Sequence, residues 1–218
     1  MDLFKFWFGL PPQDLLRLLL PAALLTLATV LPGRGVARAA AFGVALALPF
    51  LRPLDTPAPL TAAWSALWLV VAWQVGLPAP DNAPSPRRRP GAVESGAVGL
   101  LVGVALLLLM AASLARQDLE PPVGRRVLMA LLLMGLGVLH LMLRGHVRRA
   151  AIAFAALGLG LQVLDGVARG AELAGSAPAR AEVWLATAIA VALVVRLGHA
   201  RERFAGSPWV SDAHDLHD

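Results

Sequence analysis

The chain contains no cysteine. It therefore has no thiols for disulfides, for thiolate metal sites or for a Cys-ligated iron–sulfur cluster. Catalytic signatures are missing too, because the sequence has no G-x-S-x-G, no H-E-x-x-H and no phosphate-binding loop. No histidine pair is spaced across predicted helices for haem ligation. We predict no catalytic residues, no metal site and no cofactor.

Charged residues are scarce, at 15% of the 218 residues, whereas hydrophobic residues make up 58%. The mean hydropathy is +0.69, and a soluble fold of this length cannot enclose so much apolar surface. We therefore predict an all-α, polytopic membrane protein. The sequence pI near 11.3 would suit a nucleic-acid partner, but the arginines stand one to three at a time between apolar runs. We interpret them as topology signals and predict no nucleic-acid partner.

A helical hairpin is the clearest element of the sequence. Val127–Leu143 and Ala150–Val167 are runs of 17 and 18 residues without Lys, Arg or Glu. At a rise of 1.5 Å per residue, each helix would be about 26 Å long, close to the hydrocarbon thickness of a bilayer. Clusters of arginine are retained in the cytoplasm, so we predict a cytoplasmic turn between the two helices. Its basic residues are Arg144, His146, Arg148 and Arg149.

Five more apolar runs bring the predicted number of membrane spans to seven. The spans are Leu15–Leu31, Ala39–Leu51, Leu60–Leu77, Ser95–Ala115, Val127–Leu143, Ala150–Val167 and Ala181–Leu197. An interfacial segment and three spans occupy residues 1–77, a Pro/Arg-rich loop 78–93, a four-span half 94–197, and a polar cytoplasmic tail 198–218. This topology places ten arginines on the side of the hairpin turn and seven Lys or Arg residues on the other, which predicts the amino terminus outside and the carboxy terminus inside.

Polar groups within spans are costly and are functional candidates by default. Four are candidates for an ion or water path: His140, Gln162, Asp165 and Thr187. His140 would alternatively reach the headgroups, since it lies one turn before the basic turn. Asp165 would alternatively form a helix-end ion pair with Arg169 at i,i+4. His140 and Asp165 are predicted to lie about 18 Å apart along the hairpin, too far to pair.

Glycines and tryptophans predict helix packing. Gly99 and Gly103 have the G-x-x-x-G spacing that lets another helix approach closely. Trp64 and Trp68 share one face of their span and Trp73 falls roughly opposite, which favours packing or lipid contact over a cofactor site. The tail carries histidines among aspartates, but without a rigid scaffold we interpret it as solvated or partner-docking rather than metal-binding.

From about residue 125 onward, the sequence resembles three related subunits: the K-type subunit of complex I, the C-type subunit of multisubunit cation/proton antiporters and the E-type subunit of group 4 hydrogenases. The resemblance lies in LMLRGHVRRAAIAFAALGLGLQVL, LATAIAVALVVRLGHARER and WVSDAHDLHD. It implies a non-catalytic membrane-arm subunit of a proton- or sodium-translocating assembly in the bacterial cytoplasmic membrane. The implied partners are a large antiporter-like subunit, other membrane-arm subunits and the lipid bilayer. The alternative is a structural anchor or assembly subunit of an unrelated membrane complex.

The sequence departs from the K-type pattern at one position. K-type subunits place a glutamate in the second of the three helices, and the matching position here is Ala155. The polar position one to two turns later is kept as Gln162. Antiporter-type relatives also lack that glutamate. The resemblance therefore implies that partner subunits, rather than this chain, carry the titrating groups.

Overall fold

All the regular secondary structure in the described part of the chain is helical. The computed structural model describes residues 12–31, 33–50, 56–77, 120–143, 147–169 and 177–205, with Leu101, Val104, Ala105, Leu108, Leu109, Ala112 and Ser113. The helices are α1 (Pro12–Val30), α2 (Arg34–Ala47), the 3-10 helix η1 (Leu48–Phe50), α3 (Ala58–Gly76), α5 (Pro121–Leu143), α6 (Val147–Arg169) and α7 (Ala177–Ala205). No strand occurs in these residues, so the all-α prediction is confirmed for them.

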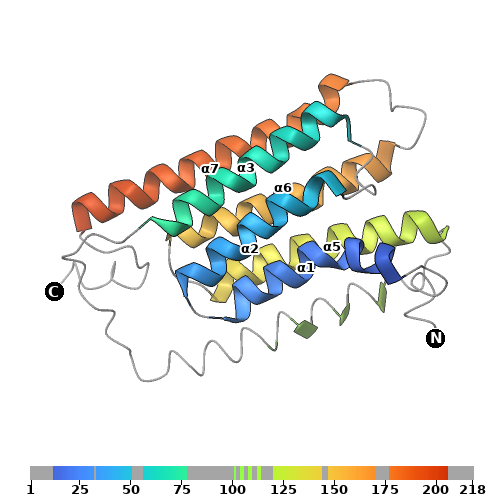
Figure 1. Ribbon diagram of the computed structural model, residues 1–218, viewed down its shortest axis with the longest axis horizontal. Coiled ribbons are helices and arrows are strands. Elements are labelled where there is room, and N and C mark those ends of the chain that lie inside the picture. Colours follow the sequence, from blue (N-terminus) through green and yellow to red (C-terminus); the bar gives the residue numbers. More distant parts are fainter. Residues whose placement is uncertain are drawn as a thin grey trace.

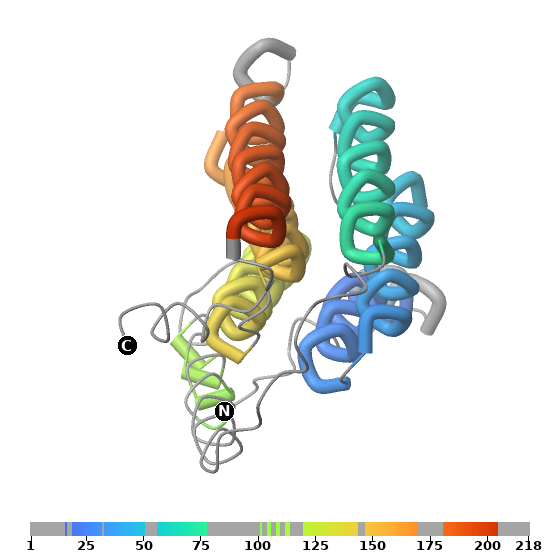
Figure 2. Tube along the Cα trace, turned by 90° about the vertical axis from the view of Figure 1, so that its left-hand side faces the viewer, coloured from blue at the N-terminus to red at the C-terminus, as the bar shows by residue number. Residues whose placement is uncertain are grey.

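The helices form two layers of three (Figures 1 and 2). One layer contains α1, α2 and α3, and the other contains α5, α6 and α7, each helix packing against its neighbour in the chain. Between the layers, α1 contacts α5, and α3 contacts α6 and α7. In Figure 1, α1, α3, α5 and α7 run in one direction and α2 and α6 run in the other. Consequently α3 ends at the end of the bundle opposite to the one where α5 begins.

Four described helices are long and apolar enough to cross a membrane. They are Ala58–Gly76, Pro121–Leu143, Val147–Arg169 and Ala181–Phe204. The apolar part of α1, Leu19–Val30, is shorter, and the 14-residue α2 rises about 21 Å, less than a bilayer core of about 30 Å. The described part of the chain is thus all helical in its regular structure and contains four helices of spanning length, as in a membrane protein.

The predicted second span begins too late. We expected a loop with Arg34 and Arg38 before a helix starting at residue 39, but α2 starts at Arg34 itself. Gly33 has φ 120°, a conformation that other residues rarely adopt, and it lets the chain reverse within a very short turn. At the other end, Pro49 lacks an N–H, and the α-helix gives way to η1 after Ala47.

Two further boundaries were wrong in the carboxy-terminal layer. Arg148 and Arg149, predicted in the basic turn, lie in the first turn of α6 and are buried. Residues 198–205, predicted to belong to the polar tail, continue α7 to Ala205. In both places charged side chains were assigned to loops because they were expected to need water. The structure instead gives Arg148, Arg149 and Glu202 partners inside the bundle.

Packing within the carboxy-terminal layer depends on glycines. A Cβ added at Gly137 of α5 would lie 2.9 Å from a backbone carbonyl oxygen of α6, and one at Gly160 of α6 would lie 2.8 Å from a carbonyl oxygen of α5. Gly158 makes room in the same way for Thr187 of α7. Glycine thus brings the backbones of α5 and α6 into direct contact, as membrane helix pairs require.

The tryptophans of α3 follow the helical pattern expected of them. Trp64 and Trp68 are fully buried, whereas Trp73 on the opposite face is 62% exposed. The first two pack in the core that both layers share, together with Leu133 of α5 and Leu159 of α6. The shared-face prediction is therefore confirmed, and α3 is held by one face only.

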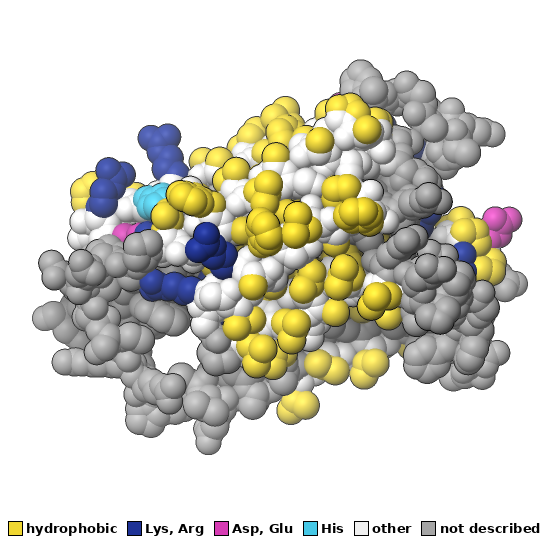
Figure 3. Space-filling model, viewed as in Figure 1, with side chains coloured by type: hydrophobic (Ala, Val, Ile, Leu, Met, Phe, Trp, Pro, Cys, Tyr) yellow, Lys and Arg dark blue, Asp and Glu magenta, His cyan; other side chains and the backbone are white. Residues whose placement is uncertain are grey.

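Charge is distributed unevenly between the two ends of the bundle (Figure 3). We call the end that holds the carboxy termini of α3 and α7 the basic end. Its described charged residues are Arg34, Arg38, Arg148, Arg149, Arg196, Arg201, Glu202 and Arg203. The opposite end has Glu120, Arg125, Arg126, Asp165, Arg169 and Glu182. Arginine dominates the first set, whereas the second is balanced.

Candidate functional site

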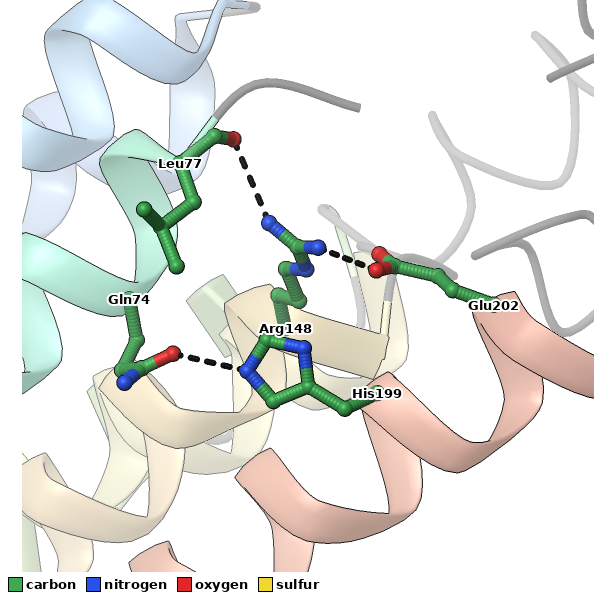
Figure 4. A network of polar contacts seen from close by, with 5 residues as sticks. All are labelled: Gln74, Leu77, Arg148, His199 and Glu202. Atoms are coloured by element: carbon green, nitrogen blue, oxygen red, sulfur yellow. Dashed lines mark hydrogen bonds and ion pairs between the residues drawn. The ribbon is translucent and has the colours of Figure 1, made fainter. Parts of the chain in front are cut away.

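A network of polar side chains joins three helices at the basic end (Figure 4). Arg148, in the first turn of α6, forms an ion pair with Glu202 of α7 and donates to the carbonyl oxygen of Leu77, 3.2 Å away, at the end of α3. One turn before Glu202, the Nε2 of His199 lies 3.0 Å from the Oε1 of Gln74 on α3. Because an amide oxygen only accepts, His199 donates this bond. The network thus couples α3, α6 and α7.

The ion pair is buried. Arg148 and Glu202 each expose only 7% of their surface. Removing a charge from water costs several kcal/mol, and that cost is recovered only when the partner and the remaining donors are well placed. Leu77 lies at the carboxy-terminal end of α3, where the helix dipole leaves partial negative charge on unpaired carbonyls. Arg148 therefore neutralises a carboxylate and a helix end at once.

The neighbouring arginine fastens a different helix. Arg149 donates through Nη2 to the carbonyl oxygens of Ala28 at 3.3 Å and of Gly33 at 3.1 Å. Ala28 is in the last turn of α1, and Gly33 precedes α2. Successive side chains on a helix diverge by about 100°, so adjacent residues point in different directions and reach different helices. Arg148 holds α3 and α7, while Arg149 holds α1 and the start of α2.

His140 belongs to the same region. Its Nδ1 lies 3.1 Å from the Oγ1 of Thr29 on α1. Thr29 donates its hydroxyl hydrogen to the carbonyl of Leu25 at 2.8 Å, so His140 Nδ1 is the donor to Thr29. His140 is only 2% exposed, which makes the headgroup alternative wrong. It links α5 to α1 inside the bundle.

The other three candidate path residues are placed separately. Gln162 is 2% exposed, and its Oε1 has no hydrogen-bond partner in the described part of the chain. Thr187 is buried and donates to the carbonyl of Val183 at 2.7 Å. Asp165 pairs with Arg169 at 2.6 Å, which confirms the helix-end ion pair. Asp165 and His140 lie toward opposite ends and do not meet.

The middle of α6 carries no ionisable group. Residues 150–161 are all apolar or glycine, and Ala155, at the position where K-type subunits carry a glutamate, is fully buried. No cluster of three or more metal-ligating side chains occurs among the described residues. Several predicted residues fall outside them: Gly99, Gly103, Arg144, His146, and His214 and His217 of the tail.

Sequence reasoning missed Thr29, Gln74, His199 and Glu202. Gln74 is the only uncharged polar residue in the last turns of α3, which was a signal of a buried contact. His199 and Glu202 follow Arg196 at intervals of three residues, the spacing of one helix face. That spacing indicated that the helix continues beyond the predicted end of the last span. Thr29 gave no signal, since threonine is common in membrane helices.

Comparison with known proteins identifies no family: no protein-family model, no curated protein and no solved structure matches this chain.

Proposed function

We propose that this chain is a non-catalytic membrane subunit of a complex-I-related assembly that translocates protons or sodium. In this proposal it lies in the bacterial cytoplasmic membrane beside a large antiporter-like subunit. Support comes from the layer α5, α6 and α7, in which a helix ending at Leu143, a helix rich in small residues that begins at Val147, and a third helix follow one another. This is the order that the sequence resemblance implies.

The observation that carries the proposal is the separation of ionisable groups along α6. Arg148 and Arg149 lie at one end and Asp165 at the other, and Gln162 is the only polar residue between them. A proton relay needs titrating groups near the membrane midplane. The described part of this chain offers only neutral groups there, foremost the buried amide of Gln162. A buried amide oxygen without a partner costs free energy, so we assign Gln162 the role of binding water or a partner group.

The arrangement of the layers also favours seven crossings, with the amino terminus outside. The carboxy end of α3 lies at the basic end, and α5 starts at the opposite end (Figure 1). A chain that connects the two must pass from one side to the other, as the predicted span Ser95–Ala115 does. The seven residues described within that span are helical. Arginines are retained in the cytoplasm, so the basic end is assigned to that side.

Isolation of the assembly tests this proposal. The full chain, tagged at its carboxy terminus and extracted in mild detergent, should copurify with a large antiporter-like polypeptide. Membrane vesicles from a strain lacking the chain should lose proton or sodium pumping. Copurification with an unrelated membrane complex, with pumping unchanged in the deletion strain, would contradict the proposal and support the structural-anchor alternative.

A further inference from the structure

A groove separates α3 and α7 on the outside of the bundle. It has a volume of about 850 Å³, within the range of ligand sites in proteins. Its apolar wall is formed by Leu67 and Val70 of α3 and by Ala188, Val191 and Ala192 of α7. Ala188 and Ala192 are one turn apart and carry a single side-chain carbon each. Because these side chains are so short, α7 leaves the space beside α3 unfilled.

The groove changes character toward the basic end. There it is lined by Gln74, Arg196, His199, Glu202 and Arg203. The charge of Glu202 is already neutralised by Arg148, and Gln74 is hydrogen-bonded to His199. Arg196 and Arg203 are both exposed and form no ion pair with other described residues. The open end of the groove therefore carries two available guanidinium groups.

We propose that this groove binds one anionic phospholipid from the leaflet at the basic end. The apolar wall runs from Ala188 to Val195, about 10 Å along α7, and would take the part of one acyl chain nearest the headgroup. The phosphate would then lie between Arg196 and Arg203, which bind phosphate through paired N–H donors. Basic pockets between membrane helices recognise anionic headgroups in this way.

A phospholipid suits the groove better than a helix of a partner protein. The acyl chain of a lipid matches the apolar wall of the groove, and its anionic phosphate matches the two arginines at the open end. A helix about 10 Å wide would have to bring acidic side chains to the level of the two arginines, a level that a phospholipid headgroup occupies by itself. The assignment rests on groove shape and charge, and it is independent of the proposed role in ion translocation.

Native mass spectrometry of the purified full chain tests the headgroup contact, with phosphatidylglycerol and phosphatidylcholine of identical acyl chains as probes. The wild type should retain phosphatidylglycerol preferentially. Arg203→Gln should weaken its retention about tenfold, because one charge-assisted contact is lost. The matched control Arg34→Gln removes an equal charge at the same end of the bundle but outside the groove. It should leave the lipid preference unchanged.

A second pair of variants tests the apolar wall. Ala192→Phe fills the groove and should reduce retention of both lipids, whereas Ala186→Phe, at another exposed alanine of α7, should not. Both sites are exposed, so both proteins should fold. Equal retention of the two lipids by the wild type would overturn the proposal, as would unchanged retention in Ala192→Phe. A third variant, Ala192→Cys, introduces the only cysteine of the chain. Stoichiometric cross-linking of this cysteine to another polypeptide in native membranes would also overturn the proposal, because a protein would then occupy the groove.

Discussion

The buried ion pair between Arg148 and Glu202 makes a prediction of defined size. Glu202→Gln keeps the shape of the side chain but leaves the guanidinium of Arg148 buried without its counter-charge. Breaking a buried pair from one side costs about 3–5 kcal/mol. The Leu77 carbonyl remains as a partner at 3.2 Å, so we expect the lower end of this range, about 3 kcal/mol. For a chain of this length, that loss lowers Tm by about 6–12 °C.

Thermal unfolding of the purified chain in one detergent measures this loss. Asp165→Asn is the matched control, because it breaks an i,i+4 pair whose side chains are 17% and 33% exposed and should cost only about 0.5 kcal/mol. Replacing both residues, as Arg148→Met with Glu202→Leu, should recover most of the stability, since two apolar side chains need no counter-charge. A Glu202→Gln protein no less stable than Asp165→Asn would refute the reasoning. So would a double variant as unstable as the single one.

Three further predictions concern other contacts. Arg149→Met removes the donor to the Ala28 carbonyl at the end of α1 and one of two donors to the Gly33 carbonyl, which keeps the N–H of Ala37 at 3.4 Å. This loss should cost about 1–3 kcal/mol in the same assay, and an unchanged Tm would contradict the assignment. Gly160→Ala pushes a Cβ to 2.8 Å from a backbone carbonyl oxygen of α5 and should lower the free energy of unfolding by about 1–3 kcal/mol. The control Gly166→Ala has open space around it and should leave the stability unchanged or raise it. Equal effects of the two variants would show that α5 and α6 are not in close contact. In the intact assembly, Gln162→Leu should impair ion pumping more than Asp165→Asn does, and Asp165→Asn should cause partial loss of pumping at most. Complete loss of pumping in Asp165→Asn, with the assembly intact, would show that this chain carries an essential proton site.

The apolar helices could be predicted from the sequence because their signal is local. The predicted span Leu60–Leu77 corresponds to α3, Ala58–Gly76, and both the predicted helix from Val127 and α5 end at Leu143. Length and hydropathy are sufficient to locate such helices. The number of membrane crossings depends on short or interrupted helices such as α2, and the length of such a helix does not determine whether it crosses.

The polar network could not be predicted, because its partners are distant in sequence. Arg148 and Glu202 are 54 residues apart, and Thr29 and His140 are 111 residues apart. The rule that charged side chains leave the membrane placed Arg148 in a loop. That rule fails when a guanidinium finds a carboxylate and free helix-end carbonyls within the bundle. Only the fold brings those groups together.

The two adjacent arginines also set an order of events during synthesis. The carbonyl of Ala28 receives its donor from Arg149, 121 residues later in the chain, and Leu77 receives its donor from Arg148, 71 residues later. At about 5–20 residues per second, the end of α1 waits roughly 6–24 s for that donor. In a nascent chain that stops before residue 148, the carbonyl groups at both helix ends lack these donors, and a membrane offers few other hydrogen-bond donors. The amino-terminal helices can therefore become a closed unit only after the first turn of α6 has been synthesised.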